Sequence, residues 1–274
     1  MNDLIGLLRL IPAGTRGKAR FARRLMKGVF DGHVTDNLGF QYDAPDLREP
    51  IAFHLAVDGV YEPETLAVIL DHLRPGDVFV DIGANIGAFT LPAARKVGKT
   101  GRVLAAEASA DIFLYLLRNV AVNGANDVIT LNCAICNSTG SVHFYPAPKE
   151  KFGMGSLGAQ FSGKPVTVPA KRLDTALEQT GIKHVDVLKI DVEGFEVSVF
   201  KGAHKLLTGT RPPLIVFEFC DWAEARVPSS QVGDAQRLLF DYGYSVWRLT
   251  DFVHKREALR EPLQVGFGML VASR

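Results

Sequence analysis

The chain has 274 residues, of which 47% are hydrophobic and 22% charged, and its 31 basic residues nearly balance its 30 acidic ones. A net charge of +1 lacks the basic excess typical of nucleic-acid-binding domains, and no apolar run approaches the ~20 residues that a membrane span needs. Three cysteines are too few, and odd in number, for a disulfide framework. We therefore expect a cytoplasmic protein in which Cys133 and Cys136 are buried thiols rather than a metal or redox site.

The first 50 residues differ in character from the rest. Residues 1–27 carry seven Lys or Arg residues against one Asp, on a predicted helix whose apolar side holds Phe21, Leu25 and Val29. We expect this side to pack on the protein, and we leave open a peripheral contact with an anionic membrane through residues 1–27. A hairpin is predicted around the turn at 36–39. Residues 1–50 are thus predicted to form a helical and hairpin extension before one domain at 51–274.

From residue 77 onward, short apolar runs alternate with helical patterns. Strands are predicted at 78–82, 103–106, 128–131, 185–190 and 214–219, and helices at 86–97, 110–123, 173–180 and 195–207. Continuous apolar runs suit parallel strands covered on both faces, and the alternation indicates βαβ crossovers. After a helix near 231–242, strands at 244–249 and 265–272, with no helix between them, predict a closing antiparallel pair. The fold class is therefore α/β, doubly wound and Rossmann-like, with a mostly parallel seven-stranded sheet.

An insertion at 134–172 separates the third and fourth of these strands. It contains two short strand-like runs, at 141–145 and 166–168, around a segment at 146–163 that is rich in Gly, Pro, Ser and Lys. Loops of this length are uncommon and often form lids or binding segments. We expect either such a segment or a disordered excursion.

A glycine turn follows the first core strand. The strand 78–82 carries Asp81 near its end, and the chain then turns through Gly83 and Gly87 into a helix. A dinucleotide site would need a third glycine for the pyrophosphate. Asp81 would repel a pyrophosphate but could hold the ammonium group of an amino-acid moiety, directly or through water. The pattern favours S-adenosylmethionine over NAD, with Asn85 of the same turn also counted as cofactor-binding.

A second acid, Glu107, ends the next predicted strand. In nucleotide-binding α/β domains an acid at this place accepts hydrogen bonds from both ribose hydroxyls. Together with Asp81 and the glycine turn, Glu107 predicts a ribose-binding position in the crevice at the carboxyl ends of the strands.

A charged triplet stands at the end of the fourth strand. Lys189, Asp191 and Glu193 alternate with apolar residues and so point to one side. Methyl transfer to a hydroxyl needs a base beside the acceptor oxygen; Asp191 is our first choice, oriented by Glu193 and Lys189, with Glu218 a weaker candidate. A structural ion pair is the alternative. Asp191 and Glu193 could also hold Mg²⁺, but the seven histidines show no ligand spacing and we expect no required metal.

With these segments in hand, the chain resembles the FkbM family of S-adenosylmethionine-dependent methyltransferases. The likeness lies in residues 59–64, 74–87 and 188–196, with support from Asn119 and Asn123. It implies a class I methyltransferase fold and O-methylation of sugars, glycans or natural products, and it implies that Tyr61 and Glu62 border the cofactor site. The family often has Glu-Pro after the second strand, whereas Glu107 is followed by Ala108.

The sequence therefore predicts an S-adenosylmethionine-dependent O-methyltransferase domain at 51–274 with a small-molecule or glycan acceptor. One alternative is an RNA methyltransferase, although Asp191-Val192-Glu193-Gly194 lacks the proline-aromatic segment that stacks a flipped base. Another is a non-catalytic S-adenosylmethionine-binding module, which would not need Asp191. The acceptor and the oligomeric state are left open.

Overall fold

The computed structural model describes residues 11, 18, 21, 22, 30–159, 164–228 and 230–274. Its main sheet has the strand order β11-β12-β10-β9-β3-β4-β5. The strands are β3 (Val78–Ile82), β4 (Arg102–Ala106), β5 (Ile129–Leu131), β9 (Val187–Ile190), β10 (Leu214–Cys220), β11 (Ser245–Arg248) and β12 (Phe267–Ser273). All neighbours pair in parallel except at β12, which runs antiparallel to β10 and β11. The predicted mostly parallel, seven-stranded, doubly wound sheet is confirmed.

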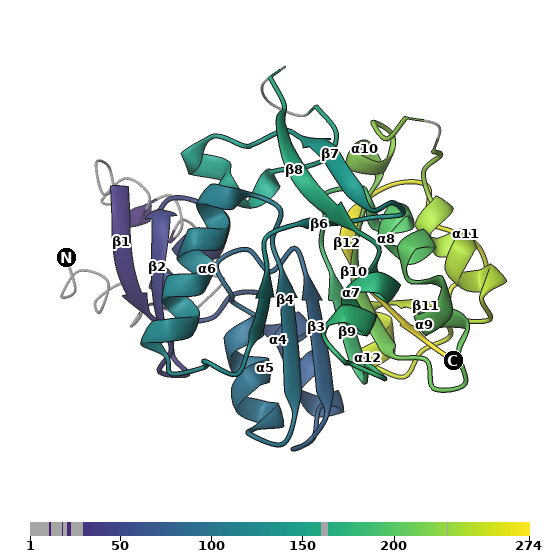
Figure 1. Ribbon diagram of the computed structural model, residues 1–274, viewed down its shortest axis with the longest axis horizontal. Coiled ribbons are helices and arrows are strands. Elements are labelled where there is room, and N and C mark those ends of the chain that lie inside the picture. Colours follow the sequence, from purple (N-terminus) through teal and green to yellow (C-terminus); the bar gives the residue numbers. More distant parts are fainter. Residues whose placement is uncertain (1–10, 12–17, 19–20, 23–29, 160–163, 229) are drawn as a thin grey trace.

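Helices cover both faces of this sheet, because alternate residues of each strand are buried on opposite sides (Figure 1). One face packs against α4 (Pro63–His72), α5 (Thr90–Val97) and α12 (Leu249–Val253). The other packs against α7 (Leu173–Gln179), α8 (Glu196–Gly202), α9 (His204–Thr208) and α11 (Asp234–Asp241). A further short helix, α10 (Asp221–Glu224), follows β10. The carboxyl ends of the parallel strands are thus left free to meet a ligand.

Three predicted elements differ from the structure. The helix expected at 86–97 begins at Thr90, because Gly83, Asn85 and Gly87 all have positive φ and residues 83–89 form turns. The helix expected at 195–207 is split into α8 and α9 at Ala203. The expectation of no helix between the last two strands was wrong, since the short helix α12 lies there and packs against α4.

The predicted hairpin is present as β1 (Phe30–Thr35) and β2 (Gln41–Asp46), beside α6 (Ala110–Val122) (Figure 1). Two side-chain amides take the place of a neighbouring strand at β2. Asn119 pairs with the backbone of Asp43 at 2.7 and 3.1 Å, and Asn123 pairs with the backbone of Gln41 at 2.9 and 2.7 Å. The hairpin shares its buried core with α6 and α3 (Pro50–Val57). The boundary at residue 50 stays a prediction.

Most of the basic segment lies outside the described residues. Within it, Lys18 is buried and its Nζ lies 2.8 Å from Asp58 Oδ1. Phe21, which was expected to pack on the protein, is 55% exposed, and Ala22 is buried instead. Leu25 and Val29 lie outside the described residues. No helix within the described ranges is long and apolar enough to cross a bilayer.

The insertion forms a second sheet of three strands, β6 (Ala134–Ile135), β7 (Gly140–Phe144) and β8 (Val166–Lys171), in the order β6-β8-β7. Cys133 and Cys136 are buried beside β6 as free thiols, as expected. Between β7 and β8 the predicted loop contains the 3₁₀ helix η1 (Lys149–Met154), and residues 160–163 of this loop lie outside the described residues. This loop brings part of the insertion over the carboxyl ends of the main strands.

Candidate functional site

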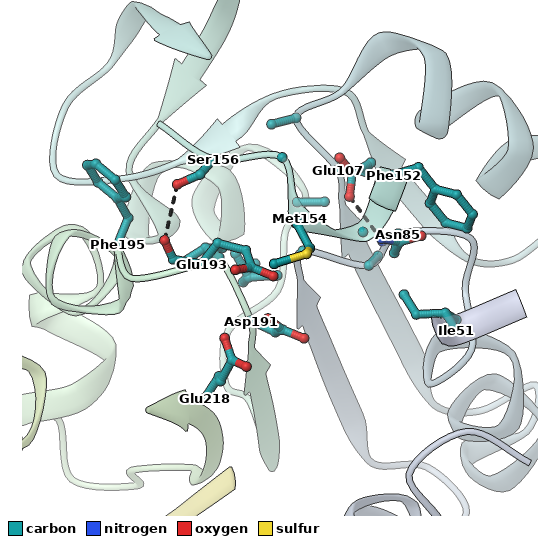
Figure 2. Close-up of a pocket in the computed structure, with 18 of the residues that line it drawn as sticks. Ile51, Asn85, Glu107, Phe152, Met154, Ser156, Asp191, Glu193, Phe195 and Glu218 are labelled. Atoms are coloured by element: carbon teal, nitrogen blue, oxygen red, sulfur yellow. Dashed lines mark hydrogen bonds between the residues drawn. The ribbon is translucent and has the colours of Figure 1, made fainter. Parts of the chain in front are cut away.

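A cavity of about 380 Å³ opens at the carboxyl ends of β3, β4 and β9 (Figure 2). Six of the predicted site residues line it: Gly83, Asn85, Glu107, Lys189, Asp191 and Glu193. The other three, Glu62, Asp81 and Gly87, are not among its lining residues. The structure therefore brings together, around one cavity, residues of the glycine turn, Glu107 and the charged triplet.

The glycine turn is held against the end of β9. Gly83 has φ 75°, and a Cβ built on it would lie 1.9 Å from the backbone oxygen of Asp191. Any side chain at Gly83 would push the two loops apart. Gly87, with φ 96°, instead faces Leu116 of α6, 3.1 Å from where its Cβ would be. Gly83 thus sets the spacing between two loops, and Gly87 sets the packing of a helix.

Glu107 follows β4 and presents a carboxylate that two backbone groups fix. Its Oε2 accepts the N–H of Asn85 at 3.0 Å, and its Oε1 accepts the N–H of Ser109 at 2.8 Å. Asn85 itself adopts φ 52°, a left-handed conformation that directs its N–H toward Glu107 (Figure 2). Burial raises the pKa of Glu107 to about 7. The carboxylate is therefore both oriented and costly to ionise.

Asp81 lies behind the cavity wall and has no exposed surface. Its Oδ2 accepts a hydrogen bond from the hydroxyl of Thr90 at 2.6 Å, and its Oδ1 lies 3.6 Å from the ammonium group of Lys189. That ammonium group also lies 3.6 Å from Asp191 Oδ2 and donates to the carbonyl of Gly83 at 3.2 Å. The ion pair weighed as an alternative is therefore present, and Lys189 links Asp81 to the acid-bearing loop.

The charges around Lys189 determine its protonation. Burial alone would lower the pKa of Lys189, but the surrounding carboxylates, Asp191 and Asp81 first among them, outweigh this effect and raise it. Burial raises the pKa of Asp81, against the opposing effect of Lys189. Lys189 is thus kept charged as the central cation of this end of the cavity.

Three carboxylates, which we call the acid cluster, gather at the end of the cavity beside β9 and β10. One oxygen each of Asp191, Glu193 and Glu218 lies within 4.8 Å of the others, as Figure 2 illustrates. Glu218 Oε2 is buried and has no hydrogen-bond partner among the described residues. Burial, followed by the charges of Asp191 and Glu193, raises the pKa of Glu218 well above its ordinary value. The weaker candidate from the sequence thus belongs to the same cluster as Asp191.

Residues 152–157, which we call the strap, belong to the segment 146–163, for which either a lid or binding segment or a disordered excursion was expected; the sequence did not indicate which part of it would reach the cavity. The strap lines the cavity, and Ser156 Oγ donates to the backbone oxygen of Glu193 at 3.1 Å (Figure 2). Glu49 was also missed: its Oε2 caps α3 by accepting the N–H groups of Ile51 and Ala52, at 2.8 and 3.3 Å. Burial raises the pKa of Glu49 to about 7. A Glu directly before Pro50, at a helix start, was the available signal.

Glu62 lies in a neighbouring cavity of about 620 Å³. This second cavity shares Glu218 and Phe267 with the first. Glu62 has φ 41°, and burial, followed by the charge of Asp191, raises its pKa. The two cavities therefore meet at the acid cluster.

Comparisons with known proteins match the chain to a methyltransferase family. The Methyltransferase FkbM domain matches residues 81–246. The chain is 32% identical over 161 residues to Methyltransferase sdnD of Sordaria araneosa, which covers 48% of this chain and 62% of that protein. It is 28% identical over 141 residues to the hexuronic acid methyltransferase AglP of Haloferax volcanii, which covers 52% of this chain and 56% of that protein. The chain thus spans less than two thirds of the length of these two relatives.

Among solved structures, it is similar to a precorrin-6y C5,15-methyltransferase of Geobacter metallireducens, with 14% identity and a TM-score of 0.46, over 78% of this chain and 90% of that one.

Proposed function

We propose that this chain, which belongs to the methyltransferase FkbM domain family, transfers the methyl group of S-adenosylmethionine to a hydroxyl of a sugar, glycan or natural product. Methyltransferase activity follows from the family; the cofactor, the oxygen acceptor and the residue roles are the proposal. The observation that carries it is the oriented carboxylate of Glu107 beside the glycine turn. The hexuronic acid methyltransferase among the relatives supports a sugar acceptor.

The residues present fit this cofactor. Glu107 offers two carboxylate oxygens to the paired donors of a ribose diol, and its rigid hold on Asn85 and Ser109 keeps it aimed. Gly83 and Asn85 would border the methionine portion. Asp81 would act through Lys189 and Thr90, since it has no exposed surface of its own, and Gly87 would act through packing.

The cofactor supplies, when bound, an electrophilic methyl group on a sulfonium. Asp191 accepts the proton of the acceptor hydroxyl, because its carboxylate stands at the mouth of β9 and its side chain is 26% exposed. Lys189, whose ammonium group lies 3.6 Å from Asp191 Oδ2, holds it in place, and the carboxylate of Glu193 lies beside it in the same cluster of acids. The strap and the apolar cavity wall exclude water from the reacting groups.

The alternatives are less well supported. The carboxylates of Asp191, Glu193 and Glu218 would repel a phosphate backbone, which disfavours an RNA acceptor. A non-catalytic binding module would need no proton acceptor such as Asp191, whose side chain is 26% exposed at the mouth of β9. Membrane contact through residues 1–27, the cytoplasmic location and the absence of a required metal stay predictions.

The first test is calorimetric titration with S-adenosylhomocysteine, with NADH as a control ligand. We expect micromolar binding by the wild type and by Glu178→Ala, an exposed glutamate on α7, and clearly weaker binding by Glu107→Ala. Asp191→Asn should bind as the wild type does and lose turnover. Heat with NADH and none with S-adenosylhomocysteine would refute the proposal.

A further inference from the structure

Apart from Glu218 and Phe267, the second cavity is lined by residues that the first cavity does not use. It lies between the start of α4, the end of β10, the start of β12 and the start of α12. Its volume of about 620 Å³ is larger than that of the first cavity, and the two share Glu218 and Phe267. A molecule in the second cavity would therefore reach the acid cluster from the side opposite the glycine turn.

We propose that this second cavity is the acceptor site, and that it selects an uncharged polyhydroxylated ring over the same ring bearing a carboxylate. The inference rests on the proposed function and deepens it, because it assigns the acceptor a place and a charge. That charge differs from the charge of the hexuronic acid named for the Haloferax volcanii relative, which supports the sugar class alone.

The polar groups of the cavity are suited to hydroxyl donors. Three acidic side chains line it, Glu62, Glu64 and Glu218, and a carboxyl group accepts hydrogen bonds from hydroxyls whether it is ionised or protonated. Glu218 Oε2, where the cavities meet, is buried and lacks a partner among the described residues, so it is available to a hydroxyl. The ring of Phe267 is 79% exposed and offers an apolar surface to the face of a sugar ring.

The charges of the cavity oppose an anionic acceptor. Arg248 is the one cation among the described residues that line it. Arg248 of β11 pairs with Leu270 of β12, and Glu218 of β10 pairs with Met269 of β12. The strand β12 therefore lies between Arg248 and Glu218 in the sheet. Arg248 is outnumbered by the three acids of the lining, and because Arg248 and Glu64 are both exposed, solvent screens their charges alike.

At the inner end, the acid cluster already resists further negative charge. Burial and the charges of Asp191 and Glu193 raise the pKa of Glu218, so these carboxylates destabilise one another's ionised forms. A substrate carboxylate placed there would add to the same repulsion. Hydroxyls carry no such cost.

The test is saturation-transfer NMR on the protein loaded with S-adenosylhomocysteine. The probes are methyl glycosides of glucose, galactose and mannose, each paired with its uronic acid counterpart, which differs only at the terminal carbon. We expect at least one neutral glycoside to bind about tenfold more tightly than its uronate, a difference of ~1.4 kcal/mol.

Two matched variants locate the effect. Glu64 is exposed at the second position of α4. Glu64→Lys should reduce the tenfold preference for the neutral glycoside over its uronate about fivefold, because it replaces a negative charge at the rim of the cavity by a positive one. Asp111 is an exposed acid at the second position of α6 and lines neither cavity. Asp111→Lys makes the same charge change at the same helical position and should leave the ratio unchanged.

Three results would overturn the inference: no binding by any neutral glycoside, equal or tighter binding of the uronates, or an unchanged ratio in Glu64→Lys. Calorimetry with S-adenosylhomocysteine on the same preparations separates the two proposals. Failure to bind that compound refutes the proposed function, whereas normal binding with a preference for uronates refutes this inference alone.

Discussion

Replacing Glu107 with Gln should change how the free energy of unfolding depends on pH. Burial raises the pKa of Glu107 from an ordinary 4.5 to about 7 in the folded protein. A carboxyl with a raised folded-state pKa contributes stability that is fully present below pH 4.5 and is lost as pH rises through about 7. The interval between the two values, at ~1.36 kcal/mol for each pH unit, corresponds to roughly 3 kcal/mol.

The substitution has a second effect that does not vary with pH. Both oxygens of Glu107 accept backbone N–H groups, from Asn85 and Ser109. A glutamine side chain can accept only one of them, so the other loses its partner at a cost of ~1–3 kcal/mol. This constant cost lowers the unfolding free energy of the variant equally at every pH. The raised pKa is therefore tested by how the difference in unfolding free energy between variant and wild type changes with pH.

Urea unfolding between about pH 5 and pH 8.5 measures the profile. Over this range we expect the difference in unfolding free energy between wild type and Glu107→Gln to move by roughly 2.5 kcal/mol in favour of the variant as pH rises, because part of the change already lies below pH 5. Glu178→Gln, on an exposed face of α7, should run parallel to the wild type. Parallel curves for Glu107→Gln as well would show that Glu107 titrates normally, and would refute the reasoning.

Three further substitutions test the groups around the turn. Gly83→Ala, whose Cβ would lie 1.9 Å from the Asp191 carbonyl at φ 75°, should destabilise the protein by more than ~2 kcal/mol in urea and abolish S-adenosylhomocysteine binding in calorimetry. Lys189→Met should cost ~3–5 kcal/mol by urea unfolding near neutral pH, because Asp81 stays buried without its cation; a loss below ~1 kcal/mol would contradict this. Thr90→Val removes the 2.6 Å hydrogen bond to Asp81 and should cost ~1–3 kcal/mol in thermal or urea unfolding, while Thr90→Ser should retain most of the stability.

The sheet could be predicted because its strands are buried on both faces. Every residue of β3 and of β9 is buried, so their apolar runs were unambiguous. The same logic placed Glu107 and Asp191 at strand ends, where parallel topology brings them to one edge. Local backbone geometry was harder to predict. The start of α5 depends on the positive φ of Asn85, a conformation that asparagine tolerates but that its presence in a sequence does not by itself predict.

The remaining site residues depend on contacts between distant segments. Glu218 joins Asp191 only because β10 lies next to β9, and a strand order is not readable from one apolar run. The predicted binding segment at 146–163 reaches the cavity through the strap, whose Ser156 bonds to Glu193, 37 residues away. Side-chain pattern alone could not select which part of the segment would do so.

The contact between Gly83 and Asp191 constrains how the protein can evolve. The backbone of each loop occupies the space that a side chain or an inserted residue in the other would need. Mutations that lengthen either loop must therefore be compensated in the other, so we expect changes in the two loops to occur together among related sequences. The lining of the second cavity, which shares only Glu218 and Phe267 with the first, is free of that constraint. If the second cavity is the acceptor site, as we propose, new acceptor preferences can arise there while the contact between the two loops stays unchanged.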